Sequence, residues 1–341
     1  MKKDSILIIG ACGQIGTELT AALIKQYGAK NIVTADIHPH APGWNNYISL
    51  DVLDDAHLDQ VVRKYAVTQI YLLAGTLSAK GEMQADKAWK LNVQSLLSVL
   101  ETAQANGIEK VFWPSSIAVF GPGAPRHNCP QHALTEPDTV YGISKRAGEH
   151  WCNYYFEKYG LDVRSVRFPG LISHTAAPGG WTTDYAVDMF HQALENGRYE
   201  CFLEEDNCLP MMYMPDAVRA ILELMDAPKD RISVRTSYNL TGLSFAPCDL
   251  VAEIRKHLPD LRVSYMPDHR NTIAAGWPGS MTDSQARLDW QWRPAYDLKE
   301  MTGDMLKRLS EDKGVTLPEP VTARQEYPDF PIDNYVSTQS V

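Results

Sequence analysis

The chain has 341 residues, of which 44% are hydrophobic and 9% aromatic, enough to bury the core of one large domain or of two closely joined lobes. Its formal net charge of −10 argues against nucleic acid or an acidic membrane as a partner, because either would require a clustered basic surface, and favours a small-molecule ligand. The six cysteines are scattered without a C-x-x-C pair, so we expect neither a disulfide framework nor a thiolate zinc site, and a reducing, cytoplasmic compartment.

Apolar stretches of strand length alternate with amphipathic stretches of helix length through the first half of the chain. The expected strands cover residues 6–9, 31–35, 69–73, 110–113 and 162–166, and the expected helices cover 14–27, 57–65, 86–105 and 141–159. Nearly continuous apolar strands joined by helical connections predict a parallel sheet covered on both faces. We therefore expect a Rossmann-type, doubly wound α/β domain in residues 1–170. The run at 6–9 is a buried strand, because it is too short for a signal peptide or a membrane-spanning helix.

The regular alternation ends after Gly170. Proline and glycine mark a long loop around residues 169–180, and shorter helices are expected near 183–195, 216–225 and 249–257. In an open α/β sheet the ligand lies beyond the carboxyl ends of the strands, so this less regular part is well placed to cover it. We expect a smaller C-terminal substrate-binding lobe in residues 171–315, with some segments returning to the core, and an arm or tail in residues 316–341.

A glycine-rich turn, residues 10–16, follows the first strand and opens the first helix. Glycines there permit a tight turn, close approach of backbone amides to a pyrophosphate, and tight packing of the helix on the sheet. Asp36, at the end of the second strand, suits ribose hydroxyls and would repel the 2′-phosphate of NADP, which predicts NAD. His38 and His40 lie just beyond it without an evident third ligand, so we expect no metal. The expected cofactor contacts in this region are Gly10, Gly13, Gln14, Ile15, Gly16 and Asp36.

Tyr141 and Lys145 are four residues apart, which places a phenol and an ammonium on one face of the same helix. An exposed tyrosine–lysine pair would be the simplest explanation, but residues 115–121 supply a hydroxyl-bearing strand end 25 residues before Tyr141. Together these residues resemble the Ser…Tyr-x-x-x-Lys triad of the short-chain dehydrogenase/reductase superfamily. The glycine spacing G-x-x-G-x-x-G resembles that of its extended subgroup. The resemblance assigns the catalytic hydroxyl to Ser116 and not to its neighbour Ser115.

The charge of Lys145 gives this assignment a physical basis. A free tyrosine has a pKa of about 10, and an ammonium ~4 Å away in an effective dielectric of ~20 contributes roughly 4 kcal/mol, or about 3 pKa units. We therefore predict that Lys145 lowers the phenol pKa and binds the nicotinamide ribose. Tyr141 then takes the proton from a substrate hydroxyl that Ser116 holds, and the hydride passes to the nicotinamide.

The same resemblance assigns further cofactor contacts. The residues after the third strand, Asp51 and Val52, stand where such folds often contact adenine, although a simple strand-end carboxylate is an equal alternative. The loop after the fourth strand passes beside the pyrophosphate and nicotinamide in extended members, which implies contacts from Leu73, Ala74 and Gly75. Asn92 stands where the family often carries a structural asparagine, and an ordinary polar helix residue is the alternative.

Five stretches are similar to NAD-dependent threonine 3-dehydrogenases of the extended group: 114–121, 167–173, 178–186, 209–214 and 289–294. The resemblance runs from about residue 5 to about 310. It implies zinc-free oxidation of L-threonine at the β-hydroxyl to 2-amino-3-oxobutyrate, and a homodimer formed through helices 86–105 and 141–159. Where the family usually has a third glycine after Gly179 and Gly180, this chain has Trp181, which puts the local loop geometry in question.

Threonine needs partners for its carboxylate and its ammonium, because burying either charge unpaired costs several kcal/mol. The expected donors to the carboxylate are Ser78 and Thr182, and Asp184 is the expected partner of the ammonium, with Gly179 in the same loop. Residues 182–184 also have the composition of a helix N-cap, and both roles are possible together.

Two other functions share these features. Nucleotide-sugar epimerases and dehydratases have the same fold, NAD and triad, but they typically carry Arg-x-x-Asn after the sheet strand, whereas Arg167 is followed here by Gly170. A non-catalytic NAD-sensing regulator would not need the triad, so the presence of Ser116, Tyr141 and Lys145 argues against it.

Overall fold

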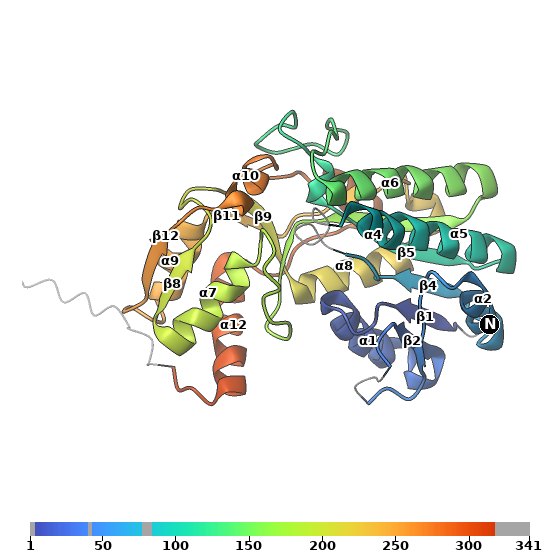
Figure 1. Ribbon diagram of the computed structural model, residues 1–341, viewed down its shortest axis with the longest axis horizontal. Coiled ribbons are helices and arrows are strands. Elements are labelled where there is room, and N and C mark those ends of the chain that lie inside the picture. The colour runs from blue at the N-terminus through green and yellow to red at the C-terminus, as the bar shows by residue number, and fades with distance from the viewer. Residues whose placement is uncertain (1–3, 40–42, 77–83, 318–341) are drawn as a thin grey trace, which may run out of the picture.

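A computed structural model describes residues 4–39, 43–76 and 84–317 and contains a seven-stranded sheet within those ranges (Figure 1). All of its strand pairs are parallel, and the order is β10-β6-β5-β4-β1-β2-β3. The strands are β1 (Ile6–Ile9), β2 (Ile32–Asp36), β3 (Tyr47–Ser49), β4 (Gln69–Leu72), β5 (Lys110–Ser116), β6 (Asp162–Phe168) and β10 (Tyr238–Asn239).

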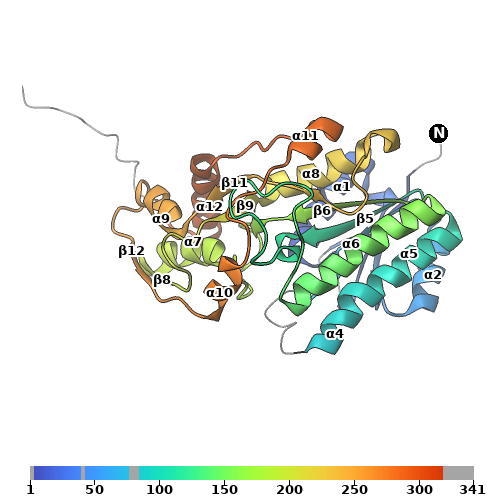
Figure 2. The same cartoon turned by 90° about the horizontal axis from the view of Figure 1, so that it is seen from above.

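Helices cover both faces of this sheet, because alternate side chains of each strand point to opposite sides. Ile6 and Ile8 of β1 pack in one apolar cluster with residues of α1 (Gln14–Tyr27) and α8 (Met214–Asp226). Leu7 and Ile9 pack on the other side with residues of α2 (Asp55–Lys64), α5 (Ser95–Asn106) and α6 (Val140–Tyr159). Figure 2 shows α5 and α6 side by side on that face. The predicted doubly wound α/β fold is confirmed.

The single helix expected at 86–105 is interrupted. It consists of α4 (Ala85–Trp89), a π-helical turn (Lys90–Gln94) and α5. Such turns are rare and occur often at functional sites. The turn buries Asn92, a residue whose polar side chain makes no apolar contribution to the core, so its amide must find hydrogen-bond partners inside the protein.

The second lobe is built on two small sheets, with order β11-β9-β7 and β12-β8. Its strands were not predicted individually, because three to five residues are too few to show a period. They are β7 (Gly170–Ile172), β8 (Arg198–Cys201), β9 (Leu209–Tyr213), β11 (Leu243–Phe245) and β12 (Arg262–Tyr265). The remaining helices are α7 (Tyr185–Asn196), α9 (Pro247–Arg255), α10 (His269–Ala275), α11 (Ser284–Trp290) and α12 (Leu298–Lys313), with 3₁₀ turns at Ala29–Asn31, Ile117–Val119 and Lys229–Arg231.

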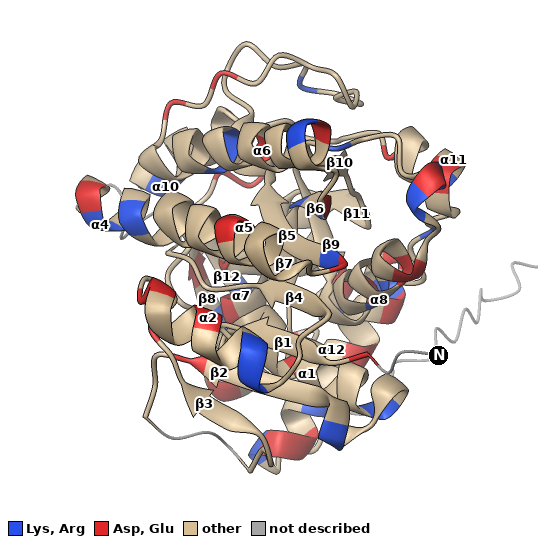
Figure 3. Ribbon diagram, turned by 90° about the vertical axis from the view of Figure 1, so that its right-hand side faces the viewer, with Lys and Arg blue, Asp and Glu red and all other residues tan. Residues whose placement is uncertain are grey.

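The surface of the molecule and the C-terminal end of the chain add three observations. No helix in the described part of the chain is long and apolar enough to cross a membrane. On the side drawn in Figure 3, basic and acidic residues are interspersed along the helices. The sequence predicted an arm or tail beyond residue 315, and residues 318–341 of it lie outside the described residues.

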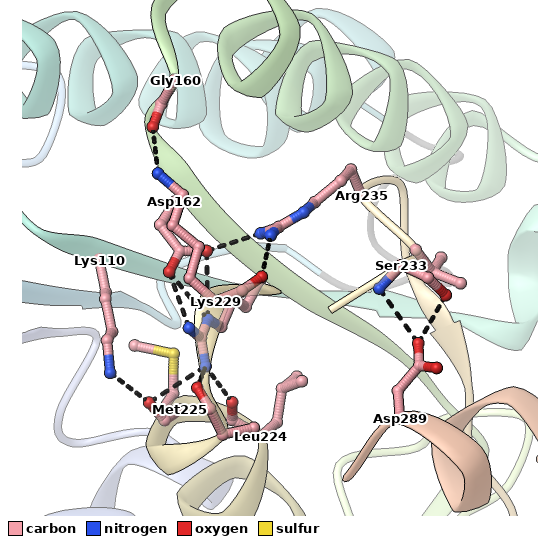
Figure 4. A network of polar contacts seen from close by, with 12 residues as sticks. Lys110, Gly160, Asp162, Leu224, Met225, Lys229, Ser233, Arg235 and Asp289 are labelled. Carbon is pink, nitrogen blue, oxygen red and sulfur yellow. Dashed lines mark hydrogen bonds and ion pairs between the residues drawn. The ribbon is translucent and has the colours of Figure 1, made fainter. Parts of the chain in front are cut away.

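Two segments of the second half return to the first domain: β10 pairs with β6, and α8 packs on α1. A buried ionic network holds them there (Figure 4). Asp162 at the start of β6 accepts hydrogen bonds from Arg164 Nη2 at 2.7 Å and from Arg235 Nη1 at 2.6 Å. Arg164 Nη1 also donates to the carbonyls of Leu224 and Ala227 at the end of α8, which binds that helix terminus to the strand.

We expect Asp162→Asn to destabilise the protein by about 3–5 kcal/mol, because two buried arginines would lose their counter-charge. Burial alone would raise the pKa of Asp162, but the bonds from Arg164 and Arg235 outweigh it and lower the pKa. The carboxylate therefore stabilises the folded state at neutral pH, and this contribution is lost as the pH falls through the lowered pKa.

Denaturant unfolding at several pH values measures this difference. Asp59→Asn is the matched control, because Asp59 pairs with Arg63 on the surface and should change stability little. An Asp162→Asn variant as stable as this control would contradict the prediction.

Candidate active site

Two adjoining hollows lie at the carboxyl ends of the parallel strands, between β1 and β4, where the order in which successive strands are added to the sheet reverses. The larger has a volume of about 1130 Å³ with the solvent at its mouth included, and the smaller has about 730 Å³. Both are of the size of small-molecule sites. Four residues line both hollows, so the two form one continuous groove: Gly10, Gly13, Leu73 and Gly75.

At two positions of the glycine-rich turn, Gly10 and Gly16, a side chain would clash with the backbone of the protein itself. Gly10 has a φ of +85°, and a Cβ there would lie 2.5 Å from Ala74 N, while a Cβ at Gly16 would lie 2.3 Å from Gly10 O. A Cβ at Gly13 would make only an ordinary 3.4 Å contact with Gly10 O. Gly13 precedes α1 and provides no side-chain cap, so the free amides at the start of that helix face the groove, which fits an anion such as pyrophosphate. Gln14 and Ile15 line the larger hollow beside it.

The acidic residues predicted to contact the dinucleotide line the smaller hollow. Asp36 Oδ2 accepts a hydrogen bond from Cys12 N at 2.9 Å, which fixes the carboxylate against the glycine-rich turn. Asp51 Oδ1 accepts from Leu53 N at 3.0 Å, and Val52 lies beside it. The hollow therefore offers a carboxylate for ribose hydroxyls and an apolar wall for a base, so the residues fit the predicted NAD.

The buried Asn92 side chain supports the loop that lines this groove without lining the groove itself. Its Oδ1 accepts from Thr76 N at 2.8 Å, and its Nδ2 donates to Thr76 O at 3.1 Å and to Ser144 Oγ at 3.0 Å. Its side chain is buried and is not part of the lining of either hollow, so the geometry supports the structural role that the sequence left open. The loop at 73–76 is thereby fixed to α6. Ser78, expected in the same loop, lies outside the described residues.

Ser116, Tyr141 and Lys145 all line the larger hollow. The Thr139 hydroxyl caps α6 by accepting a hydrogen bond from Gly142 N at 3.0 Å, so the helix begins where Tyr141 meets the end of β5. Tyr141 and Ser116 are joined by a side-chain hydrogen bond.

The neighbouring hydroxyl, Ser115, is used elsewhere. It donates to Glu149 Oε1 at 2.7 Å, and Glu149 forms a two-point, buried ion pair with Arg167 at 2.8 Å. The geometry thus favours Ser116 over Ser115 as the hydroxyl that meets a substrate.

The pKa of the phenol differs from the prediction. Burial raises the pKa of Tyr141 to about 12, although the bond with Ser116 acts to lower it, and burial lowers the pKa of Lys145 to about 7. Lys145 Nζ donates to Pro114 O at 2.7 Å and lies 4.5 Å from the centre of the Trp113 ring. The expectation that Lys145 brings the phenol pKa close to neutrality was therefore wrong for the protein alone, because loss of hydration penalises both charged forms.

The loop at 179–184 is held by Asp184. Its Oδ2 accepts from Gly179 N at 2.6 Å and from Trp181 N at 3.0 Å, and burial raises its pKa. Asp184 is the N-cap residue of α7, as the composition of residues 182–184 allowed, but its side chain makes no capping hydrogen bond to that helix. Thr182 and Asp184 line the larger hollow, whereas Gly179 lies against Trp181, with a would-be Cβ 2.4 Å from Trp181 Nε1. Trp181 therefore forms part of the wall.

The sequence missed some of the lining. Trp277, beyond α10, joins the larger hollow 136 positions after Tyr141, and no local pattern could indicate this contact. The other unpredicted lining residues are Thr76, Pro114, Ser115, Ile117, Phe168, Pro169, Gly170, Leu171, Trp181 and Thr183.

Within the described ranges, no group of three or more His, Cys, Asp or Glu residues is arranged to bind a metal. Of the two histidines considered from the sequence, His38 is described and His40 is not.

Comparisons with known proteins agree with this geometry. A model of the NAD dependent epimerase/dehydratase family matches residues 6–240. The chain is 42% identical to the mitochondrial L-threonine 3-dehydrogenase of Bos taurus, over 89% of this chain and 82% of that protein. It is 54% identical to the solved GalE-like L-threonine dehydrogenase of Cupriavidus necator in its holo form, with a TM-score of 0.88 over 89% of this chain and 99% of that one. A monomeric L-threonine 3-dehydrogenase from a metagenome is 43% identical, with a TM-score of 0.87 over 90% and 99%.

We expect Lys145→Met to raise the stability of the protein without added ligand. Because the pKa of Lys145 is lowered to about 7 in the folded state, the unfolded chain binds more protons between about pH 7 and its ordinary pKa. Wild-type stability therefore falls as the pH decreases through that range, by at most about 1.4 kcal/mol per pH unit, and levels off below it.

The advantage of the variant should follow the same course, growing from alkaline pH down to about pH 7. Denaturant unfolding of both proteins across this range measures it, with Lys30→Met as the matched loss of an exposed lysine. A variant less stable than wild type throughout would show that burial of Lys145 carries no such penalty.

Proposed function

We infer the activity of this chain from its family and its site: it belongs to the NAD dependent epimerase/dehydratase family, and within that family it is an NAD-dependent L-threonine 3-dehydrogenase. It oxidises the β-hydroxyl of L-threonine to give 2-amino-3-oxobutyrate, NADH and a proton. The observation that carries this inference is the close relation to threonine dehydrogenases over about nine-tenths of the chain, with Ser116, Tyr141 and Lys145 on one wall of the groove.

The residues divide the proton chemistry between them. Ser116 holds the β-hydroxyl of threonine, and Tyr141 as phenolate accepts its proton. Bound NAD supplies the hydride acceptor and a positive charge beside the phenol. Lys145 binds the nicotinamide ribose from its position on Pro114 O. Since burial raises the pKa of Tyr141, the rate of oxidation should rise with pH through the alkaline range.

Substrate placement follows from the loop at 179–184. We assign Thr182, together with Ser78, to the carboxylate of threonine. Asp184 accepts hydrogen bonds from the backbone of residues 179–181, so its first role is to fix this loop. Its charge on the wall of the hollow also favours the ammonium of the substrate.

The alternative of a nucleotide-sugar epimerase or dehydratase is disfavoured by Gly170. A Cβ at this position would lie 2.4 Å from Met211 Sδ and 2.8 Å from Thr183 Cβ, so the asparagine of the Arg-x-x-Asn pattern has no room. Arg167 also donates four hydrogen bonds, to Glu149, Gln131 and Asn239. A non-catalytic regulator is disfavoured by the shared position of the three triad residues.

We expect purified protein to reduce NAD in the presence of L-threonine, followed by the absorbance of NADH. Tyr141→Phe should abolish turnover and leave NAD binding nearly unchanged, because the substitution removes the proton acceptor only. L-allo-threonine, serine and UDP-glucose are the control substrates, and NADP is the control cofactor. Absence of a threonine-dependent signal would refute the substrate, and preference for NADP would refute the role of Asp36.

The oligomeric state and the compartment are further proposals. We propose a homodimer through α4 and α6, because a line of large apolar side chains on their outer faces is 36–47% exposed: Trp89, Ile143, Trp151 and Tyr154. Figure 2 shows both helices on the outside of the molecule. We place the protein in the cytoplasm, since all six cysteines are free thiols.

If the dimer forms this way, Trp151→Glu should halve the mass measured by sedimentation equilibrium, because a charge at a buried interface is costly. Leu288→Glu on α11 replaces an exposed leucine on another surface and should leave the mass unchanged. One of the relatives described above is monomeric. If the wild-type form of this protein also sediments with the mass of a single chain, the proposed dimer is excluded.

A further inference from the structure

A polar contact joins α1 to the loop that leads into the substrate side of the groove. Glu18 lies one helical turn after Gln14, and its Oε1 accepts hydrogen bonds from Ser173 Oγ at 2.6 Å and Thr175 Oγ1 at 2.7 Å. Thr175 N also donates to Ser173 Oγ at 3.1 Å. Hydrogen bonds to a carboxylate are stronger than those between neutral groups, so one oxygen fixes the conformation of residues 173–175.

The same segment is bound on its other side to the second lobe. His174 Nδ1 lies 3.5 Å from the Tyr213 hydroxyl on β9, and that hydroxyl donates to Asp304 Oδ2 of α12 at 2.7 Å. Arg308 holds the Asp304 carboxylate from the same helix at 2.8 Å. Residues 173–175 therefore lie between the cofactor-binding helix and the C-terminal helix, with polar contacts to both.

Both ends of this segment continue into the wall of the larger hollow. Gly170 and Leu171 precede it, and Trp181, Thr182 and Asp184 follow it. The start of α1 lines the same hollow through Gln14 and Ile15. If α1 shifts toward a bound dinucleotide, the hydrogen bonds of Glu18 carry that shift to the segment at 173–175 and so to the residues assigned to threonine.

We propose that Glu18 is a positioning residue that couples dinucleotide binding at the start of α1 to the order of the loop at 173–184. The dinucleotide fixes the helix, Glu18 fixes Ser173 and Thr175, and Thr182 and Asp184 are then held where they meet the substrate. The identity of the substrate rests on the proposed function, whereas the response of the loop to NAD does not.

Three variants separate this role from a contribution to stability alone. Glu18→Ala removes both bonds and should raise the KM for threonine roughly tenfold, equivalent to about 1.4 kcal/mol, with the Kd of NAD within about twofold of wild type. Glu18→Gln keeps an amide oxygen that accepts from both hydroxyls and should restore most of the effect. Gln26→Ala is the control, because Gln26 on the same helix makes a polar contact with Asp226 away from the groove.

Hydrogen exchange provides a readout that requires no threonine. NAD should slow the exchange of amides in residues 173–184 in wild type and Gln26→Ala, and this protection should be lost in Glu18→Ala although NAD still binds. Equal protection in Glu18→Ala, or a change in melting temperature with kinetics and exchange unaltered, would overturn the proposal.

If Glu18→Ala does not fold, Thr175→Ala removes one of the two hydroxyls and should give a smaller change in the same direction. A wild type inactive on threonine would refute the substrate and leave the exchange result decisive for Glu18.

Discussion

The geometry of the site depends on how closely the start of α6 approaches the end of β5. A Cβ at Gly142 would lie 2.1 Å from Ala118 O, and a Cβ at Gly148 would lie 2.4 Å from the ring of Trp113, so glycine at both positions lets the helix lie directly on the strand. Lys145, between them, is then carried onto Pro114 O and over the Trp113 ring. Tyr141, one turn earlier, meets Ser116. A bulkier helix face would separate these groups even if the sequence motif were intact.

Charged groups behind the site maintain this approach. The pair between Glu149 of α6 and Arg167 of β6 is almost completely buried, and Ser115 of β5 donates to the same carboxylate. A buried pair of this kind adds little net stability, because desolvation offsets the attraction, but breaking it is costly. It therefore fixes the relative positions of α6, β5 and β6.

The electrostatics of the triad follow from the same burial. The low-polarity surroundings raise the pKa of Tyr141 and lower that of Lys145, so the protein alone holds the phenol in its protonated form. Bound oxidised nicotinamide would place a positive charge in the same surroundings, where it would be weakly screened. The proposed base would then respond to the cofactor, and the Glu18 contact would make the substrate loop respond to it as well.

The sequence by itself determined the doubly wound fold, the glycine-rich turn with Asp36, and the pairing of Tyr141 with Lys145. These features depend on short-range spacing: apolar runs of strand length, a strand–turn–helix, and two residues one helical turn apart. Tertiary structure alone decided the direction of both pKa changes, the presence of Trp277 in the wall and the use of Asp184 to hold the loop at 179–184. Each of these depends on desolvation or on contacts between residues distant in sequence, and neither leaves a periodic signal in the chain.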